Sequence, residues 1–178
     1  MNTTRFITLA VLILAAAASR LIPHLPNFTP IGAMALLGGA AFSSKRAAFL
    51  VPLAALSLSD VVLGFYATAP VVYACFAFTV CLGFWVRGNR SVPRIAVAAI
   101  MSTVLFFVVT NFAVWAAGTL YPRTGAGLAA CYVAAIPFFR NMLAGNLIYS
   151  ALLFGALALA ESRFVRLREP VAAFAAVA

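Results

Sequence analysis

The side chains that could do chemistry are few in this sequence and lie far apart. Asp60 is the only acid before Glu161, and His24 is the only histidine. No two carboxylates are therefore spaced for general acid–base catalysis, and one histidine leaves little scope for a metal site or a general base. The chain also lacks a GxxxxGK[ST] phosphate loop, an HExxH zinc motif and a serine elbow. We expect neither an enzyme nor an intrinsic cofactor.

The three cysteines and the net charge of +9 do not point to a metal or nucleic-acid site either. Cys75, Cys81 and Cys131 lie inside apolar stretches without CxxC spacing, which disfavours structural zinc and a disulfide framework. A free cysteine in such a segment is usually a small buried packing residue. The basic residues form short clusters between apolar runs, which is typical of membrane topology signals. We expect no nucleic-acid partner.

The composition indicates that the chain lies in a membrane. Hydrophobic residues make up 66% of the 178 residues and charged residues 8%, far outside the range of soluble domains. A membrane β-barrel would alternate apolar and polar residues, whereas this chain has long unbroken apolar runs. Helices satisfy the backbone within each run. We predict one all-α integral membrane domain over residues 1–178, surrounded by lipid.

Six apolar segments are predicted to cross the membrane. They are residues 6–22, 31–43, 47–65, 71–86, 95–117 and 142–160. The first segment also resembles a signal peptide, but its removal would spoil the topology. The second is short, and segments of this length are often re-entrant. Residues 118–140 are predicted to form an outer loop and a short helix on the outer face; Pro137 and Arg140 argue against a seventh span there.

The distribution of basic residues favours six crossings of an inner membrane, with both termini in the cytoplasm. With that topology, nine of the twelve basic residues lie inside: Arg5, Lys45, Arg46, Arg87, Arg90, Arg94, Arg163, Arg166 and Arg168. Positive charge marks the cytoplasmic side of membrane proteins. A re-entrant second segment would move the cluster at residues 87–94 outside, so we expect the second segment to cross.

This topology gathers the uncommon polar residues on the outer side. The candidate solute-binding residues are His24, Asn27, Asp60, Tyr66, Tyr73, Asn111, Trp115, Arg140 and Asn141. A carboxylate inside a membrane is costly unless it is paired or faces a wet cavity, and Arg20 and Arg140 are the cations at similar depth to Asp60. The pair could tie helices together or orient a solute in an outward-opening pocket. His24 could equally be a loop residue, and the aromatic residues an interfacial belt.

Two runs of small residues, at positions 15–19 and 38–41, would let helices approach closely. Packing within the molecule explains them as well as contact with a partner does. The sequence shows no internal repeat.

Four segments carry a resemblance to a known family. They are PNFTPIGAMALLGGAAF (26–42), SLSDVVLGF (57–65), TNFAVW (110–115) and CYVAAIPFFRNMLAGNLIYSALLFG (131–155). With these segments the chain resembles a family of small bacterial membrane proteins similar to the substrate-binding S-components of energy-coupling-factor vitamin transporters. The nearest of these are the BtuM-type cobalamin-binding proteins. The resemblance covers most of the chain.

The resemblance implies six helices, an outer substrate pocket, and docking to an energy-coupling membrane subunit with ATPases. It also implies uptake of a vitamin-like small molecule, with cobalamin or another corrinoid as the transported ligand. Cys75 is then the thiolate on its cobalt, although Tyr73 competes for the same place. Two alternatives stay open: a non-transporting membrane scaffold of an envelope complex, and a membrane enzyme acting on a lipid or a corrinoid.

Overall fold

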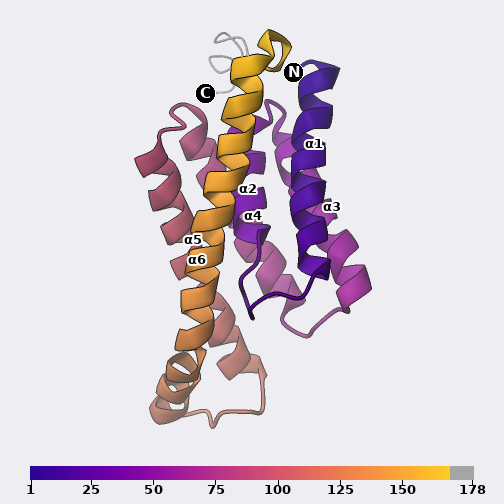
Figure 1. Cartoon of the computed structure of the whole chain (residues 1–178). Helices are drawn as coiled ribbons and strands as arrows, with labels where there is room; N and C mark the ends of the chain where they lie inside the picture. Colours follow the sequence, from indigo (N-terminus) through magenta and orange to yellow (C-terminus); the bar gives the residue numbers. More distant parts are fainter. Residues whose placement is uncertain (169–178) are drawn as a thin grey trace.

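The computed structural model describes residues 1–168, which are helical apart from their connections. The helices are α1 (Thr3–Ala18), α2 (Ile31–Ala41), α3 (Lys45–Leu63), α4 (Ala69–Arg87), α5 (Val92–Ala117) and α6 (Gly125–Arg163), with short 3-10 helices η1 (Ser19–Leu21) and η2 (Val165–Leu167). Figure 1 shows that they form one bundle. Five are long and apolar enough to cross a membrane, with η1 continuing α1, and α2 is shorter. The chain is an all-α, multi-pass membrane protein, as predicted.

Local sequence signals set the ends of these helices. The side chains of Asn2 and Thr124 each accept a hydrogen bond from the backbone N–H three residues further on, at the starts of α1 and α6. Such caps pair N–H groups that have no partner within the helix. Pro70 and Pro93 lie in the first turns of α4 and α5, where no helical hydrogen bond is lost. The 19 residues of α3 and of α4 span about 28 Å, close to the roughly 30 Å of a bilayer's hydrocarbon.

A single long helix replaces the predicted outer helix and the sixth span. α6 has 39 residues, so the prediction of a separate short helix within residues 118–140 is wrong, and only residues 118–124 form the loop. At 1.5 Å per residue α6 is about 58 Å long, longer than a span requires. Figure 1 shows the lower ends of α5 and α6 extending past the other helices.

The continuity of α6 through Pro137 has a local explanation. The proline lies inside the helix and removes one hydrogen bond, the one to the carbonyl of Val133. Phe107 of α5 packs against Tyr132 and Phe139, with ring centroids 5.6 Å and 4.9 Å apart. These contacts lie on either side of the proline. Packing against a neighbouring helix therefore supports α6 where its own hydrogen bonding is incomplete.

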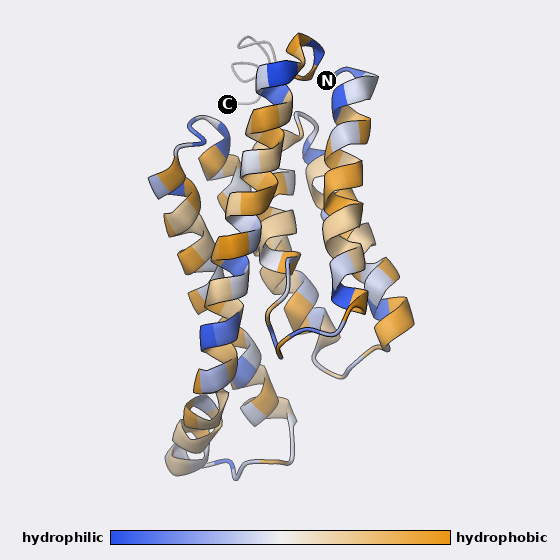
Figure 2. Ribbon diagram, in the orientation of Figure 1, coloured by the Kyte–Doolittle hydropathy of each residue, from blue (hydrophilic) through white to orange (hydrophobic). Residues whose placement is uncertain are grey.

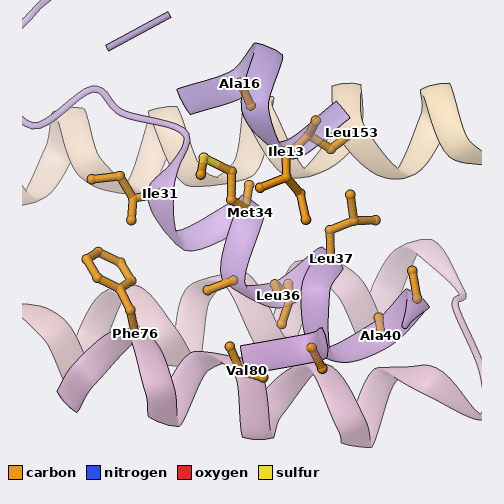
Figure 3. Packing of buried hydrophobic residues seen from close by; sticks show 14 of the residues in the cluster. Ile13, Ala16, Ile31, Met34, Leu36, Leu37, Ala40, Phe76, Val80 and Leu153 are labelled. Carbon is orange, nitrogen blue, oxygen red and sulfur yellow. The ribbon is translucent and has the colours of Figure 1, made fainter. Parts of the chain in front are cut away.

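The short helix α2 lies at the centre of the bundle. It contacts each of the five other α-helices, and Gly32 is its only residue that is not buried. Figure 3 shows Met34, Leu36 and Leu37 of α2 among side chains of α1, α4 and α6. These three side chains have no exposed surface. A helix that is apolar on every side suits this position.

Glycines allow α2 to approach its neighbours closely. A Cβ at Gly39 would lie 2.0 Å from the carbonyl oxygen of Val80, and one at Gly83 would lie 2.7 Å from the Cα of Gly39. Helices α2 and α4 therefore cross backbone against backbone. A Cβ at Gly38 would lie 2.4 Å from Pro52 of α3. The second predicted run of small residues thus serves packing within the molecule.

Charged residues gather at one end of the bundle, which is blue at the top of Figure 2. The nine basic residues predicted for the inner side all lie at this end, which we call the arginine-rich end. Buried Arg5 donates to the Oε1 of Glu161 at 2.6 Å, and Arg90 lies 3.1 Å from the same oxygen. The start of α1, the end of α6 and the connection before α5 are thereby joined.

Helix α2 reaches only part of the way from the arginine-rich end. Arg87 donates hydrogen bonds to the carbonyls of Gly39 and Phe42 at the C-terminal end of α2, where helical carbonyls have no partner of their own. Eleven residues span about 16 Å. The connection 22–30 returns from the far end of α1 to the start of α2, with Asn27 at a φ of 62°, a conformation that asparagine tolerates.

Candidate functional site

A cavity of about 390 Å³ lies beyond the N-terminal end of α2. We call it the α2 cavity. It exists because α2 is short and leaves the centre of the bundle unfilled in the half away from the arginine-rich end. Half of its lining residues are polar: Arg20, Asn27, Thr29, Tyr66, Thr68, Thr79, Ser102, Thr103, Thr110, Asn111 and Asn146.

The floor of the α2 cavity joins α5 to α6 by hydrogen bonds. The Nδ2 of Asn146 lies 2.9 Å from the carbonyl oxygen of Ala99 and 3.0 Å from the hydroxyls of both Ser102 and Thr103. Both hydroxyls also donate to the Ala99 carbonyl. The three polar side chains are buried. Polar bonds of this kind hold helices together in membranes, at about 0.6 kcal/mol each.

The orientation of the Asn146 amide leaves one acceptor unpaired. Because the Ala99 carbonyl can only accept, the amide nitrogen must face it and Oδ1 points the other way. Oδ1 is buried and has no hydrogen-bond partner. It lies beside Gly32, another lining residue, where a Cβ would stand 2.7 Å from it. A buried polar atom without a partner costs about 1–3 kcal/mol, which makes this oxygen a candidate contact for a bound molecule.

An ion pair adjoins the cavity. The Nη1 of Arg20 lies 2.9 Å from the Oδ1 of Asp60 and also bonds the hydroxyl of Ser59. The Oδ2 of Asp60 accepts a hydrogen bond of 3.0 Å from Tyr73. Asp60 is fully buried, and only Arg20 of this pair lines the cavity. The Nε of Arg20 is buried without a partner.

Of the two cations predicted near Asp60, the structure therefore selects Arg20. Arg140 is exposed and is not among the lining residues, so the structure does not place it at the α2 cavity. Positions three and four apart share one face of a helix, and Phe139, Met142 and Asn146 form such a face of α6 along the cavity. Arg140 lies outside that face.

Three of the other predicted residues line the cavity: Asn27, Tyr66 and Asn111. The amide of Asn111 donates to the carbonyl of Phe107 at 2.8 Å. Asp60 and Tyr73 do not reach the cavity, but they hold Arg20 at its wall. The structure thus brings these residues to one cavity or beside it, and their binding of a solute stays a prediction.

Three further predicted residues hold loops instead of lining the cavity. His24 is exposed, with its Nδ1 2.7 Å from the carbonyl of Ile22. Trp115 donates to the carbonyl of Pro122 at 3.0 Å, and Asn141 donates to a carbonyl of the connection 22–30 at the same distance. These three side chains do not line the α2 cavity, and local backbone groups take up their polar atoms.

Tyr66 stands in the turn between α3 and α4 and is 40% exposed. Burial of its hydroxyl, and next the negative charge of Asp60, raise the pKa of Tyr66 to about 12. The phenol is therefore neutral at physiological pH and retains its O–H donor.

Phenylalanines form the apolar walls. Phe76 of α4 lies against Phe106 of α5, with ring centroids 5.3 Å apart, and Phe138 and Phe139 line the cavity from α6. Flat apolar side chains with a few polar groups between them are the usual lining of a small-molecule site.

The structure does not bring Cys75 to the cavity. Its side chain is 4% exposed, and the lining residues of α4 are Val72, Phe76 and Thr79. The predicted cobalt ligand is buried in the bundle and does not line the α2 cavity. Within the described residues, no three His, Cys, Asp or Glu side chains form a group that could hold a metal ion.

Sequence reasoning missed the floor of the cavity. Ser102 and Thr103 interrupt an apolar run, but isolated hydroxyls in helices usually bond to their own backbone, as these two also do. Asn146 carried a stronger signal, because an amide inside an apolar helix needs partners. The sequence alone could not identify those partners on α5, 43 to 47 residues away.

A second cavity, about 440 Å³, lies between α5 and α6 at the arginine-rich end. Apart from Arg90, Glu161 and Ser150, its lining consists of apolar and small residues. It offers few groups that could orient a polar solute, so we regard the α2 cavity as the candidate site.

One comparison with known proteins identifies a family. Residues 1–171 match the model described as "Family of unknown function (DUF6580)". No curated protein and no solved structure matches the chain. The chain belongs to the DUF6580 family.

Proposed function

We propose that this member of the DUF6580 family is a solute-binding protein of the bacterial inner membrane that serves the uptake of a small, vitamin-like molecule. The observation that carries the proposal is the α2 cavity, which combines a polar floor, aromatic walls and a wall arginine inside an apolar bundle. Polar groups are costly inside a membrane and usually mark a pathway or a binding site there.

The chemistry of the lining supports binding in preference to catalysis. In the described part of the chain, amides, hydroxyls, one phenol and one guanidinium line the α2 cavity, and no carboxylate, imidazole or thiol does. Such groups orient a solute by hydrogen bonds, but a proton-transfer reaction needs an acid or base tuned near neutral pH.

The volume of the cavity favours a solute much smaller than a corrinoid. Sites for drug-sized molecules measure roughly 300–1,000 Å³, and 390 Å³ lies near the lower end of that range. A corrinoid carries a macrocycle and a nucleotide tail, so the cavity could not enclose it. We therefore propose a single-ring or two-ring solute.

The direction of binding follows from the charges. The α2 cavity lies away from the arginine-rich end, and the positive-inside rule places that end in the cytoplasm. The solute then enters from outside. Because the sequence has no nucleotide-binding loop, energised uptake needs a partner or a substrate gradient. The S-component resemblance suggests that the partner is an energy-coupling membrane subunit with ATPases.

Native mass spectrometry of the gently purified protein tests the proposal. The wild type should carry a small molecule, and Gly32→Leu, whose side chain would press on the Asn146 amide at the cavity floor, should lose it. Gly155→Leu is the matched control, because Gly155 lines the second cavity and a Cβ there meets no atom within 4 Å. This variant should keep the molecule.

Loss of the molecule from Gly155→Leu but not from Gly32→Leu would contradict the proposed site. A wild type that retains no small molecule, yet purifies with proteins of cell-wall assembly, would instead support the envelope scaffold.

A further inference from the structure

We infer that the solute is a planar ring with an N–H or O–H donor at one end and a carboxylate or carbonyl acceptor at the other. This inference rests on the proposed solute-binding function and names the chemical class of the solute. Two lining residues carry it, because each has a buried polar atom without a partner: Asn146 with its Oδ1 and Arg20 with its Nε. One atom can only accept and the other can only donate.

The Asn146 end of the α2 cavity favours a hydrogen-bond donor on the solute. Hydrogen bonds to α5 occupy the Nδ2 of Asn146, so its orientation is fixed and Oδ1 is left for another group. Gly32 has no side chain, so only its backbone lies near that side of the amide. The oxygen is enclosed in the solute-free structure, so the first turn of α2 must move slightly for a solute donor to reach it.

The Arg20 end of the α2 cavity favours a hydrogen-bond acceptor on the solute. Asp60 and Ser59 hold the Nη1 of Arg20, while Nε remains without a partner at the wall of the cavity. The positive end of the α2 helix dipole also points toward the cavity. In the described chain no lining residue is acidic, so no carboxylate there would pair with a cation. The wall arginine and the N-terminal end of α2 both favour a carboxylate or carbonyl over an ammonium group.

The space between the two ends selects a flat ring. Phe76, Phe106 and Phe139 line it, and aromatic faces stack favourably on other rings. A flexible aliphatic chain would fill the volume but would lose more conformational freedom on binding.

A matched set of three indoles tests the inference. Indole-3-acetate has both the ring N–H and the carboxylate, 1-methylindole-3-acetate lacks the N–H, and 3-methylindole lacks the carboxylate. Equilibrium dialysis measures their binding to the full-length protein in nanodiscs. We expect indole-3-acetate to bind about tenfold more tightly than either analogue, because each analogue leaves one buried polar atom unpaired.

Asn146→Leu locates the donor contact. Ser102 and Thr103 keep their hydrogen bonds to the Ala99 carbonyl in this variant, so no hydroxyl is left unpaired and folding should be retained. The variant should bind indole-3-acetate and its N-methyl analogue equally. Gly32→Ala places a methyl group 2.7 Å from the Oδ1 position and should act in the same way if Asn146→Leu folds poorly.

Ser150→Ala is the control. Ser150 also has a buried hydroxyl without a partner, but it lies one turn further along α6 and lines the second cavity. This variant should keep the tenfold preferences of the wild type.

Each contrary result overturns a stated part of the inference. If N-methylation weakens binding as much in Asn146→Leu as in the wild type, Asn146 is not the acceptor. If 3-methylindole binds as tightly as indole-3-acetate, the acceptor end is wrong. If none of the three indoles binds, the solute class is rejected, and the proposed function is then judged by the mass spectrometry of the purified protein.

Discussion

Asp60 and Arg20 form one ion pair but have different positions relative to the α2 cavity. The buried carboxylate accepts hydrogen bonds from Arg20 and Tyr73, while the guanidinium also bonds Ser59 and reaches the cavity. Burying two charges is costly, and removing one member leaves the other without compensation. The sequence identified Asp60 as an unusual intramembrane carboxylate, but it could not choose between Arg20 and Arg140, because that choice depends on which helix faces turn inward.

Asp60→Asn should therefore destabilise the fold strongly. We expect a loss of about 3–5 kcal/mol, because Arg20 then keeps a buried charge without its counterion. Arg140→Ala, at an exposed position, should change stability by no more than about 0.5 kcal/mol. Thermal unfolding in detergent without added solute measures both. Equal melting temperatures for the two variants would show that the Arg20–Asp60 pair is not a structural element.

At the scale of the elements, the length of α2 decides where the cavity lies. The sequence predicted this helix and its approximate bounds from an apolar run ending in small residues. It did not show that α2 is surrounded by the five other α-helices, because a central position depends on contacts between distant segments. The continuity of α6 through Pro137 was also missed. Proline usually ends or kinks a helix, and the sequence does not show that Phe107 of α5 packs against α6 on either side of it.

Gly39→Ala should loosen the crossing of α2 and α4. The new methyl group would lie 2.0 Å from the carbonyl of Val80, so the two backbones must separate, at a cost of about 1–3 kcal/mol or more. Gly155→Ala has open space around its Cβ and gains helix propensity of up to about 1 kcal/mol. Thermal unfolding should show a lower melting temperature for Gly39→Ala and an unchanged or higher one for Gly155→Ala. The reverse order would contradict the close crossing.

At the scale of the whole molecule, composition and charge predicted the fold class well. Apolar runs located the helices, and the basic clusters placed nine residues at one end, as the structure has them. The polar site was predicted only in part. Polar side chains in loops and near helix ends could be identified as candidates from the sequence. The buried floor at Ser102, Thr103 and Asn146 could not, because it depends on how α5 and α6 pack.

Reporter fusions test the orientation of the bundle. Fusions after Arg46 and Arg94 should report the cytoplasm, and fusions after Thr68 and Arg123 should report the outside, because the first pair follows basic clusters at the arginine-rich end. An outside signal after Arg94 would reverse the proposed direction of binding.

The most direct test of the central claim, a wet cavity that opens to the outside and reaches the middle of the bundle, is cysteine accessibility. In a background with Cys75, Cys81 and Cys131 changed to alanine, Thr110→Cys introduces a thiol in the cavity wall. Val109→Cys is the control, because Val109 is the preceding residue of α5, is 38% exposed, and does not line the cavity. A membrane-impermeant thiol reagent added outside intact spheroplasts should label Thr110→Cys and leave Val109→Cys unlabelled. Labelling of Thr110→Cys only from the cytoplasmic side, or from neither side, would contradict the account.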